Sequence, residues 1–198
     1  MKTKILRVKG DWLEVLNDCR ATVGKDARDS IPSIDFRKRI LIAEHSPIRD
    51  ISIKWFWDGI KSFSATHFSR HKWECFIETQ RSDRTGIPRD ELPQGALVSF
   101  TGEANSQHVI DTSRKRLCYL ADPDTREYWE DLKIESRKVE PELSDVSVPN
   151  CIYRGGCPEM QSCGFFEAFT KKHGMFSSIQ DRYDAYNDDF YKRVKEKL

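Results

Sequence analysis

The tightest constraint on how this chain folds is a run of alternating residues between positions 51 and 57. Large apolar side chains stand at every second position of the run, at Ile51, Ile53, Trp55 and Trp57. Successive side chains of a β-strand point to opposite faces, so the alternation predicts a strand with one strongly apolar face. Asp58-Gly59 is expected to end it. We expect both tryptophans to lie in the core rather than to form a stacking platform for a base.

Helical periodicity surrounds this strand. Apolar residues recur every three or four positions, which predicts helices over residues 12–19, 36–44, 60–71, 103–120 and 123–139. A first strand is expected over residues 4–9. His67 and His71 fall one turn apart in the third helix, so they are expected to point the same way. The last two helices predict a hairpin, and Asp122-Pro123 begins the second of them as cap and first-turn proline.

Composition predicts the character of two further segments. Residues 81–102 are rich in Arg, Asp, Pro and Gly, which indicates a long exposed loop. Long loops in compact domains are usually functional, and a lid is one such role. The tail from Gln180 is charged and aromatic, which predicts a peripheral helix.

Length and charge limit the classes of partner. A chain of 198 residues favours one compact domain, or a domain with an appendage. Its net charge of +1 leaves no global field that would attract nucleic acid or a membrane surface, so neither is expected as a partner. The N-terminus lacks the apolar run of a signal peptide, and no later stretch approaches the roughly 18 apolar residues of a membrane span. We therefore expect a cytoplasmic protein.

The six cysteines are expected to be reduced thiols, because no secretion signal precedes them. Cys151, Cys157 and Cys163 are each separated by five residues, which differs from the paired spacing of common structural zinc sites. His173 is a candidate fourth ligand if they do bind a metal, and an iron–sulfur cluster is a rarer alternative. We predict no metal and interpret these cysteines as thiols of a turn-rich cap.

Two short segments carry the residues that suggest a function. The first is Glu44-His45-Ser46-Pro47, and the second is Ser69-Arg70-His71-Lys72, which Thr79-Gln80-Arg81 follows. Both concentrate cations, an imidazole and amide or hydroxyl donors where a predicted helix gives way to a loop. These are the groups that hold phosphates and a flat heterocycle. The chain is therefore interpreted as a nucleotide-handling protein.

The order of these parts resembles the flavin-dependent thymidylate synthases, whose signature is Arg-His-Arg followed several residues later by Ser-x-Arg. The resemblance covers roughly residues 36 to 140. It implies a homotetramer of mixed α/β (α+β) class, with a central antiparallel sheet flanked by helices and a helical hairpin. A domain over residues 1–148 would then precede a cysteine-containing cap and helical extension over residues 149–198.

The same resemblance implies an FAD-dependent methyltransferase that reductively methylates dUMP to dTMP, with methylenetetrahydrofolate and NADPH as co-substrates. The residues that match the flavin site are His45, Ser46, Arg70, His71 and Lys72. The residues that match the nucleotide site are His67, Thr79, Gln80, Arg81, Arg114 and Arg116, of which Arg81 and Arg114 are expected to act in catalysis.

Several positions depart from the family pattern. Lys72 replaces an arginine, Thr79 replaces a serine, Asp50 stands where the family commonly ends in Glu-His, and an arginine expected near Leu120 is missing. The alternative is a divergent relative that binds FAD or a pyrimidine nucleotide, with altered base modification such as hydroxymethylation, or with no catalysis. Purely structural roles also remain open, since His45 can cap a turn and His67 can be a core imidazole.

Overall fold

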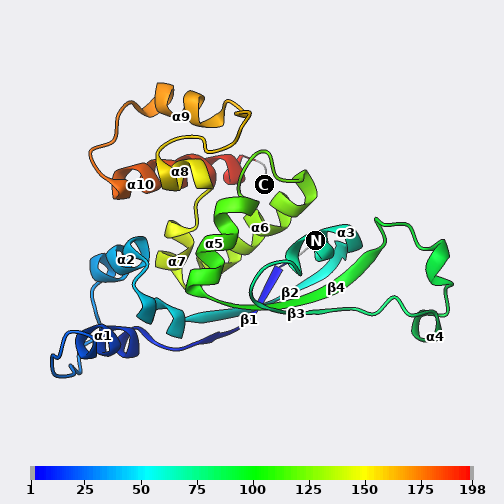
Figure 1. The fold of residues 1–198 in the computed structure, drawn as a ribbon, viewed down its shortest axis with the longest axis horizontal. Coiled ribbons are helices and arrows are strands. Elements are labelled where there is room, and N and C mark those ends of the chain that lie inside the picture. Colours follow the sequence, from blue (N-terminus) through cyan, green and yellow to red (C-terminus); the bar gives the residue numbers. More distant parts are fainter. Residues whose placement is uncertain (1–2, 197–198) are drawn as a thin grey trace.

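The computed structural model describes residues 3–196 and is built around one antiparallel sheet (Figure 1). Its strands are β1 (Thr3–Lys9), β2 (Ser52–Lys61), β3 (Glu74–Ile77) and β4 (Leu97–Asn105), in the order β1-β2-β4-β3. Three helices lie over one face of this sheet, namely α3 (Ser62–Phe68), α5 (Ser106–Arg116) and α6 (Pro123–Ser136) (Figure 1). A further layer above them consists of α8 (Asn150–Arg154), α9 (Phe165–His173) and α10 (Ile179–Lys195). The expected mixed α/β class with an antiparallel sheet is confirmed.

The apolar strand is longer than predicted. Asp58-Gly59 does not end β2 but forms a bulge, since Trp57 pairs with Phe100 while Ile60 pairs with Val98. Gly59 has a φ of +76°, a conformation that glycine adopts without the steric cost of a Cβ. The strand therefore continues to Lys61, and α3 (Ser62–Phe68) begins directly after it.

The tryptophans lie in the core, as predicted. Trp55 and Trp57 are fully buried, and Trp129 of α6 (Pro123–Ser136) packs edge-on against Trp55 with 5.8 Å between ring centroids. Gly102 pairs with Trp55 across the β2–β4 ladder, and a Cβ at Gly102 would lie 2.4 Å from the indole ring. Glycine at this position leaves room for the indole beside the backbone of β4.

The helix predicted over residues 103–120 is wrong at its start. Residues 97–105 form β4, and the helix α5 covers only Ser106–Arg116. Gly102 and Ala104 face the core with small side chains, which hides the strand alternation in the sequence. The hairpin of α5 and α6 is confirmed, because Trp129 Nε1 donates a hydrogen bond of 2.9 Å to Ser113 Oγ.

The helix predicted over residues 60–71 is also shorter, because α3 ends at Phe68. The chain then turns into β3, which the sequence did not predict, and Trp73 packs against Trp55 with 5.0 Å between ring centroids. His71 lies in this turn. The expectation that His67 and His71 share one helix face is therefore wrong.

The remaining elements surround this core. They are α1 (Trp12–Ala21), α2 (Ile34–Ala43), η1 (Ser46–Asp50), α4 (Ser82–Thr85), η2 (Arg89–Glu91), α7 (Pro141–Val146), α8 (Asn150–Arg154), α9 (Phe165–His173) and α10 (Ile179–Lys195). The tail is helical, as predicted, and α10 buries one side, where Asn187 Oδ1 accepts a hydrogen bond of 2.8 Å from Lys133 Nζ of α6. Over residues 3–196, every helix is too short or too polar to cross a bilayer.

Candidate functional site

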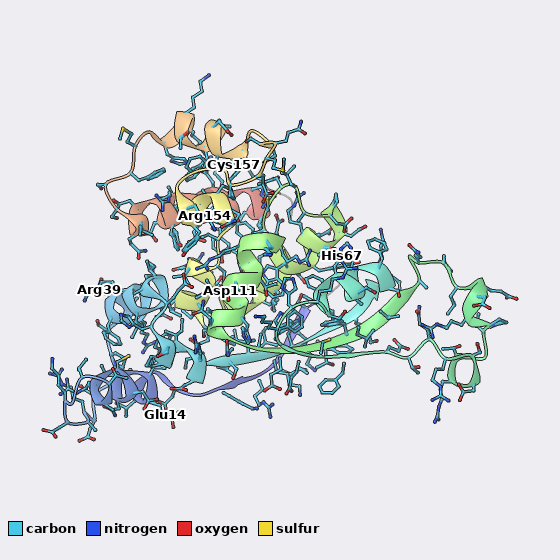
Figure 2. The ribbon with its side chains drawn as sticks, in the orientation of Figure 1. Glu14, Arg39, His67, Asp111, Arg154 and Cys157 are labelled. Atoms are coloured by element: carbon cyan, nitrogen blue, oxygen red, sulfur yellow. The ribbon has the colours of Figure 1, made fainter. Side chains whose placement is uncertain are left out.

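A cavity of about 330 Å³ lies beside α3. Its lining comes from α3, the turn after it and the loop before β4, and consists of Ser62, Phe63, Thr66, His67, Arg70 and Gln94. It is hereafter the His67 pocket. Figure 2 shows His67 at the α3 end of the sheet, far from Arg39 on α2. The pocket combines an imidazole, a guanidinium, hydroxyls, an amide and an aromatic ring.

A chain of hydrogen bonds from α6 orients the imidazole of this pocket. The Thr125 hydroxyl donates to Asp122 Oδ1 at 2.9 Å and lies 3.2 Å from His67 Nδ1. Because the hydroxyl proton points to Asp122, the hydroxyl oxygen accepts from Nδ1–H of His67. Burial raises the pKa of Asp122, but hydrogen bonds from Thr125 and the nearby His67 and Lys61 outweigh it and hold that pKa below its ordinary value. Asp122 therefore stays a carboxylate that anchors the chain.

Behind the pocket, Arg116 of α5 joins the two histidines. Its Nε donates to His71 Nε2 at 2.9 Å, and its Nη2 donates to the His67 carbonyl at 2.8 Å. Burial, together with the cations of Arg116 and Lys115, lowers the pKa of His71 to about 4. His71 is therefore neutral near pH 7 and carries its one ring proton on Nδ1, because Nε2 is an acceptor. Its ring lies parallel to Trp73, with 6.1 Å between centroids.

The two cations of the signature triplet face solvent. Arg70 and Lys72 are exposed, and within residues 3–196 neither forms an ion pair. Arg70 is close enough to Arg116 to lower the pKa of that guanidinium, an effect second to burial. The Arg70 guanidinium and the Lys72 ammonium can therefore contact an anion at the edge of the pocket.

Of the residues predicted in the loop after β3, one reaches this region. Gln80 Oε1 accepts a hydrogen bond of 3.3 Å from Ser62 Oγ, so Gln80 lies next to the His67 pocket. Arg81 instead pairs with Asp83 at 2.9 Å, and the Thr79 hydroxyl accepts from the Arg81 backbone N–H at 3.3 Å. Both Thr79 and Arg81 are exposed.

His45 and Ser46 line a different cavity. It has a volume of about 560 Å³ and lies between α1, α2 and the start of η1, where Cys19, Phe36 and Ile40 supply apolar lining. It shares no lining residue with the His67 pocket. Within one chain, the structure does not bring these two groups of predicted residues together.

Arg114 also lies away from the His67 pocket. Its guanidinium pairs with Glu44 of the α2 end and with Asp111 at 3.1 Å, and it stacks over the Tyr153 ring at 3.6 Å. Two carboxylates thus surround this arginine, whereas Arg116, one half-turn along α5, reaches the His67 side.

Sequence reasoning did not find the pocket residues Ser62, Phe63, Thr66 and Gln94, nor the Asp122–Thr125 support. A partial signal existed for two of them. Gln94 lies in the loop interpreted as functional, and Asp122 was recognised as a helix cap. Neither pattern indicated that the α6 N-terminus would meet α3, which depends on tertiary packing.

Comparison with known proteins gives matches in structure only. No model of a known family and no curated protein matches this chain. Crystal structures of the UMP/dUMP methylase PolB from Streptomyces cacaoi do match. The structure bound with 5-Br dUMP aligns with a TM-score of 0.59 and 14% identity over 73% of this chain and 93% of that one. This chain shares the fold of that methylase.

The second match is the same methylase bound with 5-Br UMP, with a TM-score of 0.55 and 12% identity over 73% of this chain and 92% of the methylase. At these identities the likeness concerns the fold alone. It extends over nearly the whole of the methylase and leaves about a quarter of this chain outside.

Proposed function

We propose that this protein is a pyrimidine-nucleotide-modifying enzyme that reductively methylates dUMP to dTMP, with FAD as cofactor and with methylenetetrahydrofolate and NADPH as co-substrates. One observation carries the proposal: the His67 pocket holds His67 and Arg70, with Gln80 bonded to its lining residue Ser62, in a fold shared with a methylase that was crystallised with 5-Br dUMP. The signature resemblance described above supplies the flavin and the folate.

The pocket's chemistry supports a pyrimidine nucleotide. The edge of uracil presents two carbonyl acceptors and one N–H donor, and the amides of Gln80 and Gln94 offer both kinds of partner. Phe63 provides an apolar ring for the base. In this proposal the Arg70 guanidinium lies between the two ligands and contacts both the flavin and the nucleotide phosphate. In this arrangement the Asp122–Thr125–His67 chain holds the imidazole in one orientation against the substrate.

The donor set beside the pocket also fits a flavin dinucleotide. Arg70 and Lys72 are exposed cations without a carboxylate partner in residues 3–196, which suits a diphosphate. His71 keeps an Nδ1–H for a ring acceptor, because Arg116 occupies Nε2. When bound, FAD would supply the redox chemistry. The protein residues would bind it, orient it and favour its negatively charged reduced form.

The two separate cavities support an assembly of more than one copy in this proposal, and the family resemblance supplies its homotetrameric form. His45 and Ser46 match the flavin site but lie in the cavity beside α2, away from Arg70. A site that uses both sets needs the second set from another copy of the chain. The proposed enzyme therefore assembles its sites between subunits.

A second candidate is a relative that binds FAD or a pyrimidine nucleotide but modifies the base differently or has no catalysis. The observation that favours it is the state of the two expected catalytic arginines. Arg81 pairs with Asp83, and Arg114 pairs with Glu44 and Asp111. A guanidinium that carboxylates already neutralise is less available to a substrate.

The test is stepwise. The visible spectrum of purified protein mixed with FAD and passed through a desalting column reports flavin retention, and thermal shift with dUMP and with UMP reports nucleotide binding. Re-oxidation of reduced flavin is then followed with methylenetetrahydrofolate, with and without dUMP. The proposal expects retained flavin, stabilisation by dUMP and dUMP-dependent turnover.

The matched variants are Arg70→Gln in the pocket and Arg28→Gln in the exposed loop before α2. Only Arg70→Gln is expected to weaken dUMP binding, by about tenfold or more for a lost charge-assisted phosphate contact. Binding without turnover supports the second candidate. A protein that retains no flavin and is not stabilised by either nucleotide contradicts both.

A further inference from the structure

Four of the six cysteines gather in one region of the fold. Cys118 follows α5, Cys151 belongs to α8, and Cys157 and Cys163 lie in the loop between α8 and α9. Figure 2 places Cys157 on that loop, above Arg154. Sequence spacing had grouped the last three, but it gave no sign that Cys118, more than thirty residues earlier, joins them.

Packing between α5 and the C-terminal segment brings Cys118 to this loop. One turn before Cys118, Arg114 stacks over Tyr153 of α8 at 3.6 Å. One residue after Cys118, Tyr119 stacks on Phe165 at the start of α9, with 4.7 Å between ring centroids. These contacts on both sides of Cys118 place it between α8 and Phe165, which lies two residues after Cys163.

The loop itself folds back over Cys151. The backbone N–H groups of Gly155 and Gly156 both donate to the Cys151 carbonyl at 3.0 Å, so the chain reverses immediately before Cys157. Gly155 has a φ of +73°, which this reversal requires. Near Cys163, the Gly164 N–H donates to Ser162 Oγ at 3.1 Å and starts α9.

The ligand geometry that a metal centre requires separates two kinds of centre. In a tetrahedral zinc site each sulfur lies about 2.3 Å from the ion, which forces the thiolates close together. Among residues 3–196, no three His, Cys, Asp or Glu side chains are arranged to hold such an ion. A four-iron cluster also takes four cysteine thiolates, but as corners of a larger cage it spreads them wider.

We propose that Cys118, Cys151, Cys157 and Cys163 are the ligands of an iron–sulfur cluster of the four-iron type. The ligand number matches, and the sulfur set comes from three segments that packing contacts hold together. His173, the earlier candidate ligand, is engaged elsewhere, with its Nε2 2.8 Å from Asp189 Oδ2.

The test is anaerobic reconstitution of the full chain with ferrous iron and sulfide, followed by desalting. Iron and acid-labile sulfide are then measured per chain, and an electron paramagnetic resonance spectrum is taken after reduction with dithionite. We expect about four iron and four sulfide per chain and a signal from the reduced cluster. Colorimetric iron and sulfide assays do not depend on flavin, so the result is independent of the proposed function.

Variants decide which thiols are ligands. Cys118→Ser and Cys163→Ser are expected to lose at least half of the bound iron, whereas Cys19→Ser and Cys75→Ser keep it. Cys163 is exposed, so its replacement leaves the core intact and far-ultraviolet circular dichroism checks folding. Protein that binds no stoichiometric iron and sulfide, that binds one zinc ion instead, or that loses iron equally in all four variants overturns the proposal.

Discussion

Arg116 donates a hydrogen bond to His71 and so fixes which ring nitrogen of the neutral imidazole carries the proton. Its Nε donates a hydrogen bond of 2.9 Å to His71 Nε2, across 45 positions of the chain. The same guanidinium donates to the backbone carbonyl of His67 at 2.8 Å. One side chain of α5 thus fixes both the end of α3 and the turn that follows it, which are the two places from which the His67 pocket takes its basic residues.

The pKa of His71 makes part of the stability depend on pH. That pKa is lowered from 6.5 to about 4, chiefly by burial and then by Arg116. Between these values the unfolded chain binds a proton that the folded chain does not. The contribution is therefore complete above pH 6.5 and is lost as the pH falls toward 4. The shift corresponds to about 3 kcal/mol, and partial exposure of the ring reduces this to about 2 kcal/mol.

His71→Gln tests this relationship, because glutamine keeps an acceptor for Arg116 and does not titrate. Urea unfolding at pH 7.5 and at pH 4.5 is expected to show a smaller loss of stability for the variant than for the wild type, by about 2 kcal/mol. His45→Gln, at an exposed position, serves as the control and should behave as the wild type. Equal losses in wild type and His71→Gln would refute the assignment.

Arg116→Lys tests the positioning role of the guanidinium. Lysine keeps the charge but has one ammonium head, which does not reproduce the fork that reaches both His71 and the His67 carbonyl. We expect about tenfold weaker nucleotide binding in calorimetry, and a rise of the His71 pKa in NMR titration. Lys115→Arg, at the exposed neighbouring position, should leave both unchanged. An unaltered His71 titration in Arg116→Lys would contradict the role.

The central strand was predictable, since alternation of this strength leaves few other structures. The failures were local and have physical causes. The second half of β4 was missed because its core face continues from Val98 and Phe100 with only Gly102 and Ala104, so the alternation of large residues stops there. A Cβ at position 102 would collide with the Trp55 ring, which explains the glycine. The end of α3 was misplaced because Trp73, packed on Trp55, draws the chain out of the helix.

The candidate site was predictable in residue type and only partly in place. Arg70, Gln80, His67 and Arg116 converge, as the motif order indicated, but the Thr125–Asp122 support comes from a helix whose contact with α3 is purely tertiary. Arg114 and Arg116 were both expected at the nucleotide site. Their side chains leave α5 in different directions, so one meets Glu44 and Tyr153 while the other meets His71.

Gly102→Ala tests the close packing of β4 on the core. A Cβ at this position would lie 2.4 Å from the Trp55 ring, so either the indole or the strand must shift. Overpacking of this kind costs about 1–3 kcal/mol, which urea unfolding can resolve. Thr101→Ala, on the other face of the same strand, should cost less. In a Trp55→Phe background, Gly102→Ala should cost less stability than it does in the wild type. An equal cost in both backgrounds would show that the contact with Trp55 is not the cause.

Co-expression of two inactive variants tests whether the sites lie between subunits. His45→Ala alters the cavity beside α2, and Arg70→Gln alters the His67 pocket, which shares no lining residue with it. If each site takes one cavity from each of two copies, a mixed oligomer contains about one native site in four and regains that share of dUMP-dependent flavin oxidation. Each variant expressed alone should stay inactive.

The control is co-expression of Arg70→Gln with His67→Ala, which alter the same pocket of one chain. In this mixture every subunit carries a damaged His67 pocket, so no site can be complete and we expect no recovery. If the His45→Ala and Arg70→Gln chains form mixed oligomers but regain no dUMP-dependent flavin oxidation, the two cavities act independently and the sites are not shared between subunits.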